Sequence, residues 1–488
     1  MKKIQNLAGQ TIIYGLSTIL VRALAWLVAP FHTRIFHPTE YGIISEMYAY
    51  VAFINVVFMY GMETAFFRFA TKKEQNQDAV FSTIMFSLLA TTALFVTGFV
   101  FLSGKIAIWL QYPGKGTLVA MLAVIIGLDT LANIPFAKLR LQGKPLKYVA
   151  VKALNVLIFV GLNVLFFYPL LTKEVSFVFG FEITKINGVA FVFVANLMAS
   201  IVTLLVFIPQ FLKQQWTFCM ETWRAMMRYG LPFVIVGLAG IVNETLDRVL
   251  LKYLLPYDTL DERMAQVGIY SAAYKLSIFM NLVVQAFRMG AEPFFFKQAG
   301  EKDAKEVYAS LMKYFTIFCL IVFLGVSLNL DLIIQVLGVK YHEGKVVVPI
   351  ILMAYLFLGV FYNLSVWYKV TDKTHYAIFI ALAGAFITIA INVVFIPKIG
   401  YEASAWATLW AYLGMSFISW IWGRGHYKID YPIFSIVKYF VVAVALFLLS
   451  QQINFENLWV GLLFNNLLLV IFIIIAFILD LKNILKQS

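Results

Sequence analysis

The chain has 488 residues, of which 62% are apolar and only 13% are charged, and its mean hydropathy is +0.86. These values exclude an ordinary water-soluble protein, because too few polar residues remain to cover its surface. The net charge of +13 comes without a recognised nucleic-acid-binding module, so we attribute it to membrane topology and to contact with anionic lipid headgroups.

Apolar runs of roughly 20 to 25 residues recur along the whole chain, each long enough to cross about 30 Å of hydrocarbon as a helix. We therefore predict an all-α integral membrane protein with about 14 transmembrane helices. The predicted spans are centred near Leu20, Val56, Leu89, Val124, Phe159, Leu197, Val236, Phe279, Ile321, Leu356, Phe386, Leu413, Ala443 and Val470. The first run holds Arg22 and lacks a small-residue cleavage site, so we interpret it as a retained helix and not a secretion signal.

The second and eighth predicted spans carry similar sequences 226 residues apart. Seven of the 17 residues in 41–57 are identical to their counterparts in 267–283, where roughly one or two matches are expected by chance. Asn55 and Asn281 are one such pair. The likeness resumes after a three-residue insertion, where Glu63 aligns with Glu292. The same offset, projected backward, aligns Arg22 with Arg248, and a further match aligns Asn163 with Asn392.

Such a repeat predicts two lobes of six helices, which point the same way through the membrane because six is an even number. We expect an N-lobe over residues 1–214, a C-lobe over residues 215–428 and two added helices over residues 429–488. Two like-oriented lobes would enclose a central cleft, and rocking of the lobes would expose that cleft to each side in turn.

The orientation of the chain follows from its basic residues, because cytoplasmic loops retain Lys and Arg. If both termini are cytoplasmic, the cytoplasmic segments carry most of the Lys and Arg outside the spans, notably in residues 68–78 and 138–147. We therefore predict cytoplasmic termini.

Ionisable side chains inside the predicted spans are the candidate site residues. Each costs on the order of 3 kcal/mol at mid-bilayer, so those retained usually face a cavity or a partner. Helical spacing gathers them on particular faces of the first, seventh and eighth spans. We predict substrate binding by Arg22, Arg248, Lys275, Asn281 and Arg288. The acids expected to line the cavity or to couple transport are Glu63, Glu244, Asp247 and Glu292.

Simpler interpretations of these residues stand beside this one. Glu244 with Arg248, and Arg288 with Glu292, have the i,i+4 spacing of helical ion pairs, and mutual neutralisation is the favoured interpretation of the second pair. Lys275 can extend its ammonium toward a membrane surface. Two arginines from equivalent helices would suit a pyrophosphate, because a guanidinium forks onto phosphate oxygens and keeps its charge.

Other chemistries have little support in the sequence. Two cysteines and five scattered histidines predict neither a disulfide framework nor a metal site. No phosphate-binding GxxxxGK[ST] motif occurs. We expect no cofactor and no enzymatic activity, with coupling to Na⁺ or H⁺ left open.

The segments 36–69, 243–251, 267–277 and 391–412 resemble the polysaccharide (O-antigen type) flippases of the multidrug/oligosaccharidyl-lipid/polysaccharide exporter superfamily. The resemblance covers essentially the whole chain and implies movement of undecaprenyl-pyrophosphate-linked oligosaccharide to the outer leaflet. It also implies a bacterial inner membrane location, a lipid-tail groove from about Pro432 onward, and polysaccharide polymerase or chain-length proteins as partners. Some relatives bind sodium in the second lobe, and Asp247, Asn392 and Thr408 occupy broadly comparable helices here, but a second acid in the eleventh span is missing, which argues against a sodium site.

The sequence therefore favours a lipid-linked oligosaccharide flippase. A lipid II flippase for peptidoglycan is the closest alternative, and a multidrug cation antiporter is disfavoured by the arginines expected in the cavity. A membrane polysaccharide polymerase or ligase is a third alternative, although the predicted external loops are short and their acids form no recognised motif.

Overall fold

The computed structural model describes residues 23–24, 26–72, 75–172, 177–178, 181–182, 185–453 and 455–484, and these are overwhelmingly helical. The all-α prediction is confirmed. The β-structure in the described part of the chain is one antiparallel pair of two-residue strands, β1 (Phe177–Val178) and β2 (Phe181–Glu182).

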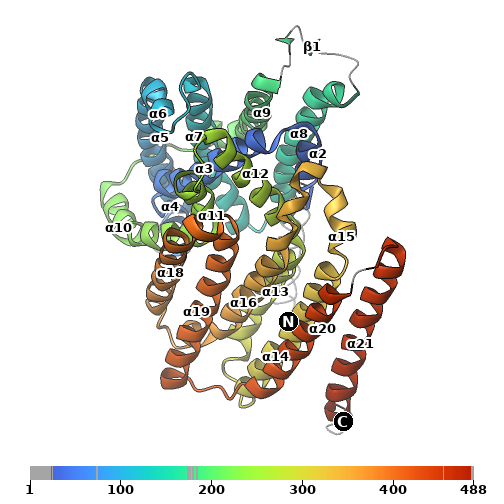
Figure 1. The fold of residues 1–488 in the computed structure, drawn as a ribbon. Coiled ribbons are helices and arrows are strands. Elements are labelled where there is room, and N and C mark those ends of the chain that lie inside the picture. The colour runs from blue at the N-terminus through green and yellow to red at the C-terminus, as the bar shows by residue number, and fades with distance from the viewer. Residues whose placement is uncertain are drawn as a thin grey trace. The chain divides into compact units, whose positions relative to one another are not determined.

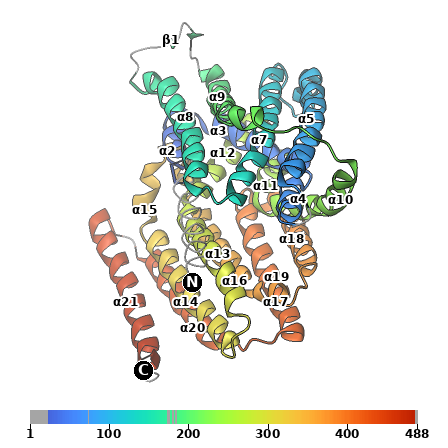
Figure 2. The ribbon, with the colours of Figure 1, turned by 180° about the vertical axis from the view of Figure 1, so that it is seen from behind.

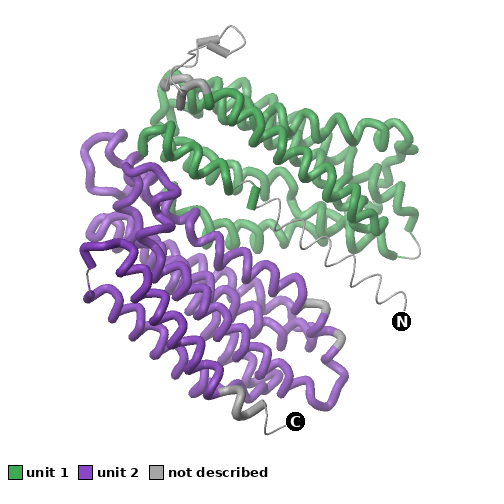
Figure 3. Tube along the Cα trace, turned by 90° about the vertical axis from the view of Figure 1, so that its right-hand side faces the viewer, with its two compact units in different colours: residues 1–249 green, residues 250–488 purple. Residues whose placement is uncertain are grey.

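The chain divides into two compact units, residues 1–249 and residues 250–488 (Figure 3). The helices that begin in the first unit are α2 (Val28–Ile35), α3 (Pro38–Met59), α4 (Met62–Ala70), α5 (Gln77–Phe101), α6 (Ser103–Trp109), α7 (Gly116–Leu141), α8 (Pro145–Thr172), α9 (Lys185–Leu212), α10 (Met220–Gly230) and α11 (Pro232–Leu254). Those of the second unit are α12 (Leu260–Leu276), α13 (Ile278–Gln298), α14 (Ala304–Ser327), α15 (Leu330–Ile333), η1 (Ile334–Val336), η2 (Val339–Val346), α16 (Val347–Leu364), α17 (Val366–Val370), α18 (Tyr376–Ile399), α19 (Glu402–His426), α20 (Ile433–Gln452) and α21 (Leu458–Ile484).

Eleven segments of the described chain are long and apolar enough to cross a membrane, and the bent pair α12 and α13 makes a twelfth. The protein is therefore a multi-pass membrane protein. The predicted number of 14 stays a prediction, because most of the first predicted span lies outside the described residues. The predicted span near Leu413 corresponds to α19, whose Trp, Tyr, Ser and Gly residues keep its hydropathy below that of the other spans.

Each unit repeats the same order of helix packing. In the first unit α5 contacts α7, α7 contacts α9, and α9 contacts α8. In the second, α14 contacts α16, α16 contacts α19, and α19 contacts α18. The second unit adds α20 and α21, which contact α14 and each other, as both ribbon views show (Figures 1 and 2). The predicted arrangement of two repeated lobes plus two C-terminal helices is confirmed.

Glycine permits close helix contact at equivalent places in the two repeats. A Cβ atom on Gly127 of α7 would lie 2.7 Å from a methyl carbon of Val96 on α5. A Cβ atom on Gly359 of α16 would overlap the ring of Phe315 on α14. Small residues of this kind let helices approach closely in a membrane, where van der Waals packing drives helix association.

The two copies of the repeated sequence form helices of different shape. Residues 42–57 lie within the single helix α3, whereas residues 268–283 run through α12, Ser277 and α13. The axes of Leu260–Leu276 and Ile278–Phe296 differ by 51°. The Ser277 hydroxyl donates to the carbonyl oxygen of Tyr274 at 2.6 Å, and such a bond competes with the helical hydrogen-bond pattern and bends helices. The aligned residue in α3 is Val51, which has no hydroxyl.

We predict that Ser277→Ala reduces the bend between α12 and α13, because the competing donor is removed. Spin labels at Asp261 and Phe296, which are exposed, report the end-to-end distance by pulsed electron resonance, and that distance should increase. Ser271→Ala is the matched control, since Ser271 is buried in α12 and its hydroxyl has no hydrogen-bond partner among the described residues. An unchanged distance in Ser277→Ala, or an equal change in the control, would refute the role of the hydroxyl.

Candidate functional site

Arg248 of α11 lies beside an acid on its own helix. Its Nη1 donates to Oδ1 of Asp247 at 2.8 Å and to the main-chain carbonyl of Glu244 at 2.6 Å. Arg248 is 9% exposed and Asp247 is 3% exposed, so both members of the pair are buried. The guanidinium thus contacts the carboxylate of Asp247 and the main chain of Glu244. The i,i+4 ion pair expected between the side chains of Glu244 and Arg248 stays a prediction.

The predicted partner of Arg248 cannot be placed, because Arg22 lies outside the described residues. The side chain of Glu292 also lies outside them. Convergence of Arg22 and Arg248 therefore stays a prediction, as does the pairing of Arg288 with Glu292.

The predicted residues of the second unit have separate environments. Lys275 is exposed near the end of α12. Arg288 lies 4.8 Å from the ring centroid of Tyr362, to whose hydroxyl its Nη1 donates at 3.4 Å. This contact is a cation–π interaction, which stabilises a cation inside an otherwise apolar bundle.

The aligned pair Asn55 and Asn281 shares an unusual feature. In each, the side-chain amide oxygen is buried and has no hydrogen-bond partner among the described residues. Such orphaned acceptors are rare in native structures and often mark a place where water, an ion or a ligand binds. Asn281 was predicted as a site residue. Asn55 was not, although the sequence repeat that aligns it with Asn281 was a sufficient signal.

Glu63, predicted as a cavity acid, forms an ion pair with Arg140 of α7. Lys152 of α8 interacts electrostatically with Glu63 and with Asp129 of α7. Asp129 in turn accepts a hydrogen bond from the Ser200 hydroxyl of α9 at 2.7 Å. The charges of the first unit are therefore cross-linked between helices, which lowers the cost of keeping them in an apolar environment.

Asp129 and Lys152 were missed by the sequence analysis. Both lie within predicted apolar spans, in the segments GLDTLAN and VAVKALN. The rule that selected Arg22 and Arg248, an ionisable residue inside a span, applies to them equally.

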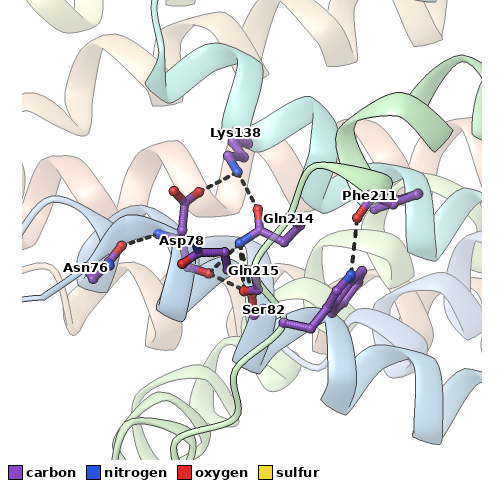
Figure 4. Close-up of polar contacts among 8 residues, drawn as sticks. Asn76, Asp78, Ser82, Lys138, Phe211, Gln214 and Gln215 are labelled. Atoms are coloured by element: carbon purple, nitrogen blue, oxygen red, sulfur yellow. Dashed lines mark hydrogen bonds and ion pairs between the residues drawn. The ribbon is translucent and has the colours of Figure 1, made fainter.

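A second polar network joins the ends of three helices (Figure 4). The Lys138 ammonium of α7 donates to Oδ1 of Asp78 at 2.8 Å and to Oε1 of Gln214 at 2.9 Å. The Ser82 hydroxyl of α5 donates to the carbonyl of Gln215 at 2.8 Å and accepts from the Gln214 amide at 3.0 Å. These bonds fix the connection after α9 to the start of α5.

The same connection continues along α5. The Cys219 amide donates to the Thr83 hydroxyl at 3.2 Å, and the Trp223 indole donates to the Ser87 hydroxyl at 2.8 Å. Met226 of α10 is fully buried in the apolar cluster formed with α4, α5 and α7. The predicted lobe boundary at 214/215 lies in this connection, whereas the two compact units divide at 249/250, after α10 and most of α11. These contacts explain why α10 groups with the first unit.

The residues implied for sodium lie in both units. In the second unit the side-chain oxygen of Asn392 accepts from the Ser404 hydroxyl at 2.7 Å, and the Thr408 hydroxyl donates to the Ser404 carbonyl at 3.0 Å. The Asn392 amide nitrogen donates to the carbonyl of Thr388 at 2.8 Å. Asn392 and Thr408 thus meet through Ser404. Among the described residues no group of three or more His, Cys, Asp or Glu side chains is arranged to hold a metal ion.

Repeated helical units, apolar spans and charges paired inside them define a membrane transporter fold, and comparison with solved structures agrees. "Lipid II flippase MurJ, inward closed conformation" matches with a TM-score of 0.70 and 14% identity, over 97% of this chain and 100% of that one. An inward-facing multidrug resistance MATE family transporter of the MOP superfamily matches with a TM-score of 0.60 and 13% identity, over 85% of this chain and 94% of that one. An outward-facing transporter of that description gives a TM-score of 0.56 and 15% identity, over 86% and 94% of the two chains.

The family described as "Polysaccharide biosynthesis protein" matches residues 7–298, and the chain belongs to this family. A search of curated protein sequences finds no match. The family bears out the likeness to polysaccharide proteins that the sequence suggested, and the likeness of fold extends to solved transporters of the MOP superfamily.

We predict that Lys138→Met lowers the free energy of unfolding by about 1–2 kcal/mol, because it leaves the buried Gln214 side chain without its charged donor and breaks the ion pair with exposed Asp78. Thermal unfolding of the purified protein in detergent measures the change. Lys105→Met is the matched control, because Lys105 is exposed on α6 and has no partner among the described residues. Equal melting temperatures for the two variants would contradict the structural role of Lys138.

Proposed function

We propose that this protein is a flippase that moves undecaprenyl-pyrophosphate-linked oligosaccharide from the cytoplasmic to the outer leaflet by alternating access. The observation that supports the proposal most directly is the combination of family and fold. The description of the family is "Polysaccharide biosynthesis protein". The likeness of fold covers the full length of a solved lipid II flippase. The proposed location is a bacterial inner membrane with both termini in the cytoplasm, and polymerase or chain-length proteins are the proposed partners.

The polar groups inside the helices suit such a cargo. A pyrophosphate needs cationic and hydrogen-bonding partners during passage, and we assign this role to Arg22, Arg248, Lys275, Arg288 and Asn281. Asn55 joins this set on the strength of its orphaned amide oxygen, which can accept hydrogen bonds from sugar hydroxyls or from bridging water. The acids Glu63, Glu244, Asp247 and Glu292 limit the net positive charge that the helices must carry.

Export of an anionic headgroup also has a favourable driving force. In an inside-negative membrane, outward movement releases about 2.3 kcal/mol per charge per 100 mV. Transport of this kind therefore needs no nucleotide-driven motor. Coupling to inward movement of Na⁺ or H⁺ would add to the driving force for export.

The test replaces Arg22 and Arg248 singly with Ala in a strain that depends on the protein for surface polysaccharide. We expect each variant to lower polysaccharide export by at least about tenfold, because a charge-assisted contact to phosphate is lost. Arg424→Ala is the control, since Arg424 is exposed at the end of α19. If the variants are present in the membrane and export is unchanged, the proposed role of the two arginines is wrong.

A lipid II flippase is the second candidate, because the solved structure with a TM-score of 0.70 carries that title. A depletion strain separates the candidates by what accumulates on the cytoplasmic side. Lipid-linked oligosaccharide with intact peptidoglycan supports the first, and accumulated lipid II with lysis supports the second. Drug hypersensitivity without either accumulation would favour a multidrug antiporter instead.

A further inference from the structure

A cavity of about 470 Å³ lies between α4 and α10 of the first unit. Its lining consists of Arg68, Phe69, Arg224, Ala225, Arg228 and Tyr229. Half of these side chains are arginines, and none is acidic. The volume falls within the range of pockets that bind small molecules or headgroups.

In the part of the chain that the structure describes, Arg68, Arg224 and Arg228 take part in no ion pair. The Arg68 guanidinium lies 4.1 Å from the ring centroid of Tyr229, and the Lys72 ammonium lies 4.7 Å from the ring centroid of Phe69. Stacking on a ring face orients a guanidinium and leaves its N–H groups available at the edge.

The walls of the cavity are held in place by backbone contact. Gly61, just before α4, has φ +77°, and a Cβ atom there would overlap the carbonyl oxygen of Gly230 at the end of α10. Trp223 and Met226 fix the opposite face of α10 to α5, as described above. Arg224 and Arg228 stand one helical turn apart on α10, so the fixed contact of α10 with α4 sets their positions relative to Arg68.

The position of the cavity along the chain favours a lipid as the source of its ligand. Both α4 and α10 adjoin segments that connect apolar spans, residues 71–76 and 213–219. Connections between spans lie at the depth of the lipid headgroups. The three arginines are exposed, so a headgroup can reach them.

We propose that this arginine cavity binds the phosphate of an anionic phospholipid headgroup. Forked guanidinium donors match phosphate oxygens in geometry and charge, and clusters of basic residues beside spans attract anionic lipids. The site binds a resident lipid of the membrane, and it is independent of the residues proposed to bind the transported cargo.

The test measures retention of phosphatidylglycerol and of phosphatidylcholine by the full-length protein in neutral detergent, using native mass spectrometry. We expect preferential retention of phosphatidylglycerol, and about tenfold weaker binding in Arg224→Ala/Arg228→Ala. Arg224→Lys/Arg228→Lys should bind with intermediate affinity, because it keeps the charge but loses the fork. Arg424→Ala should bind like the unaltered protein, since it removes an exposed arginine of α19 that lies 5.1 Å from the Trp420 ring and is not among the described residues that line this cavity.

A second arm distinguishes a lipid from a soluble phosphate compound. Inorganic phosphate and glycerol 3-phosphate are titrated against the lipid-free protein and the same variants, and we expect binding much weaker than that of the lipid. Arginine-dependent binding of the soluble compounds without lipid retention would overturn the lipid assignment. Equal phosphatidylglycerol retention by the double Ala variant, folded as judged by an unchanged melting temperature, would overturn the site itself.

Discussion

The structure depends on one constraint, which is that main-chain and side-chain polar groups inside a bilayer must find partners within the protein. Helices satisfy the main chain, and side-chain pairs between helices satisfy much of the rest. In the first unit, Glu63 pairs with Arg140, Asp129 accepts from Ser200, and Lys138 bridges Asp78 and Gln214. Each pair links different helices, so the contacts that neutralise charge also hold the unit together. Among the described residues, the amide oxygens of Asn55 and Asn281 are two of the buried acceptors without a partner, and their aligned positions in the repeat make them informative about function.

The internal repeat gives both halves of the chain the same order of helix packing. The same order of helix contacts occurs in each unit, and a glycine permits close approach at the equivalent helix pair in both. The halves have diverged at Ser277, where a hydroxyl group bends a helix whose counterpart α3 runs without a break through Val51. The two copies of one sequence pattern therefore form helices of different shape at this position.

The connection between the two repeats has a role beyond joining them. Residues 214–226 are attached along α5 by side-chain hydroxyls and by a buried methionine, and Gly230 touches Gly61. The attachment places two arginines of α10 beside Arg68 of α4. A segment that resembles a simple linker in the sequence thus forms one wall of a cationic cavity. A lipid bound there would contact both a helix of the first repeat and the helix that leads into the second.

The sequence by itself determined the membrane environment, the all-α class, the repeat and the family, because these follow from apolar run length and from matched residues along the chain. It also identified Asn281, Glu63 and Arg248 as polar residues inside spans. Only the tertiary structure decided that Glu63 pairs with Arg140 of another helix, because which helices are neighbours depends on packing between segments far apart in sequence. The pair of Glu63 with Arg140 and the cavity of Arg68, Arg224 and Arg228 arise from such contacts, whereas the bend at Ser277 follows from a hydrogen bond to Tyr274 in the preceding turn. Periodicity within one helix shows which residues share a face of that helix, but it does not show which other helix packs against that face.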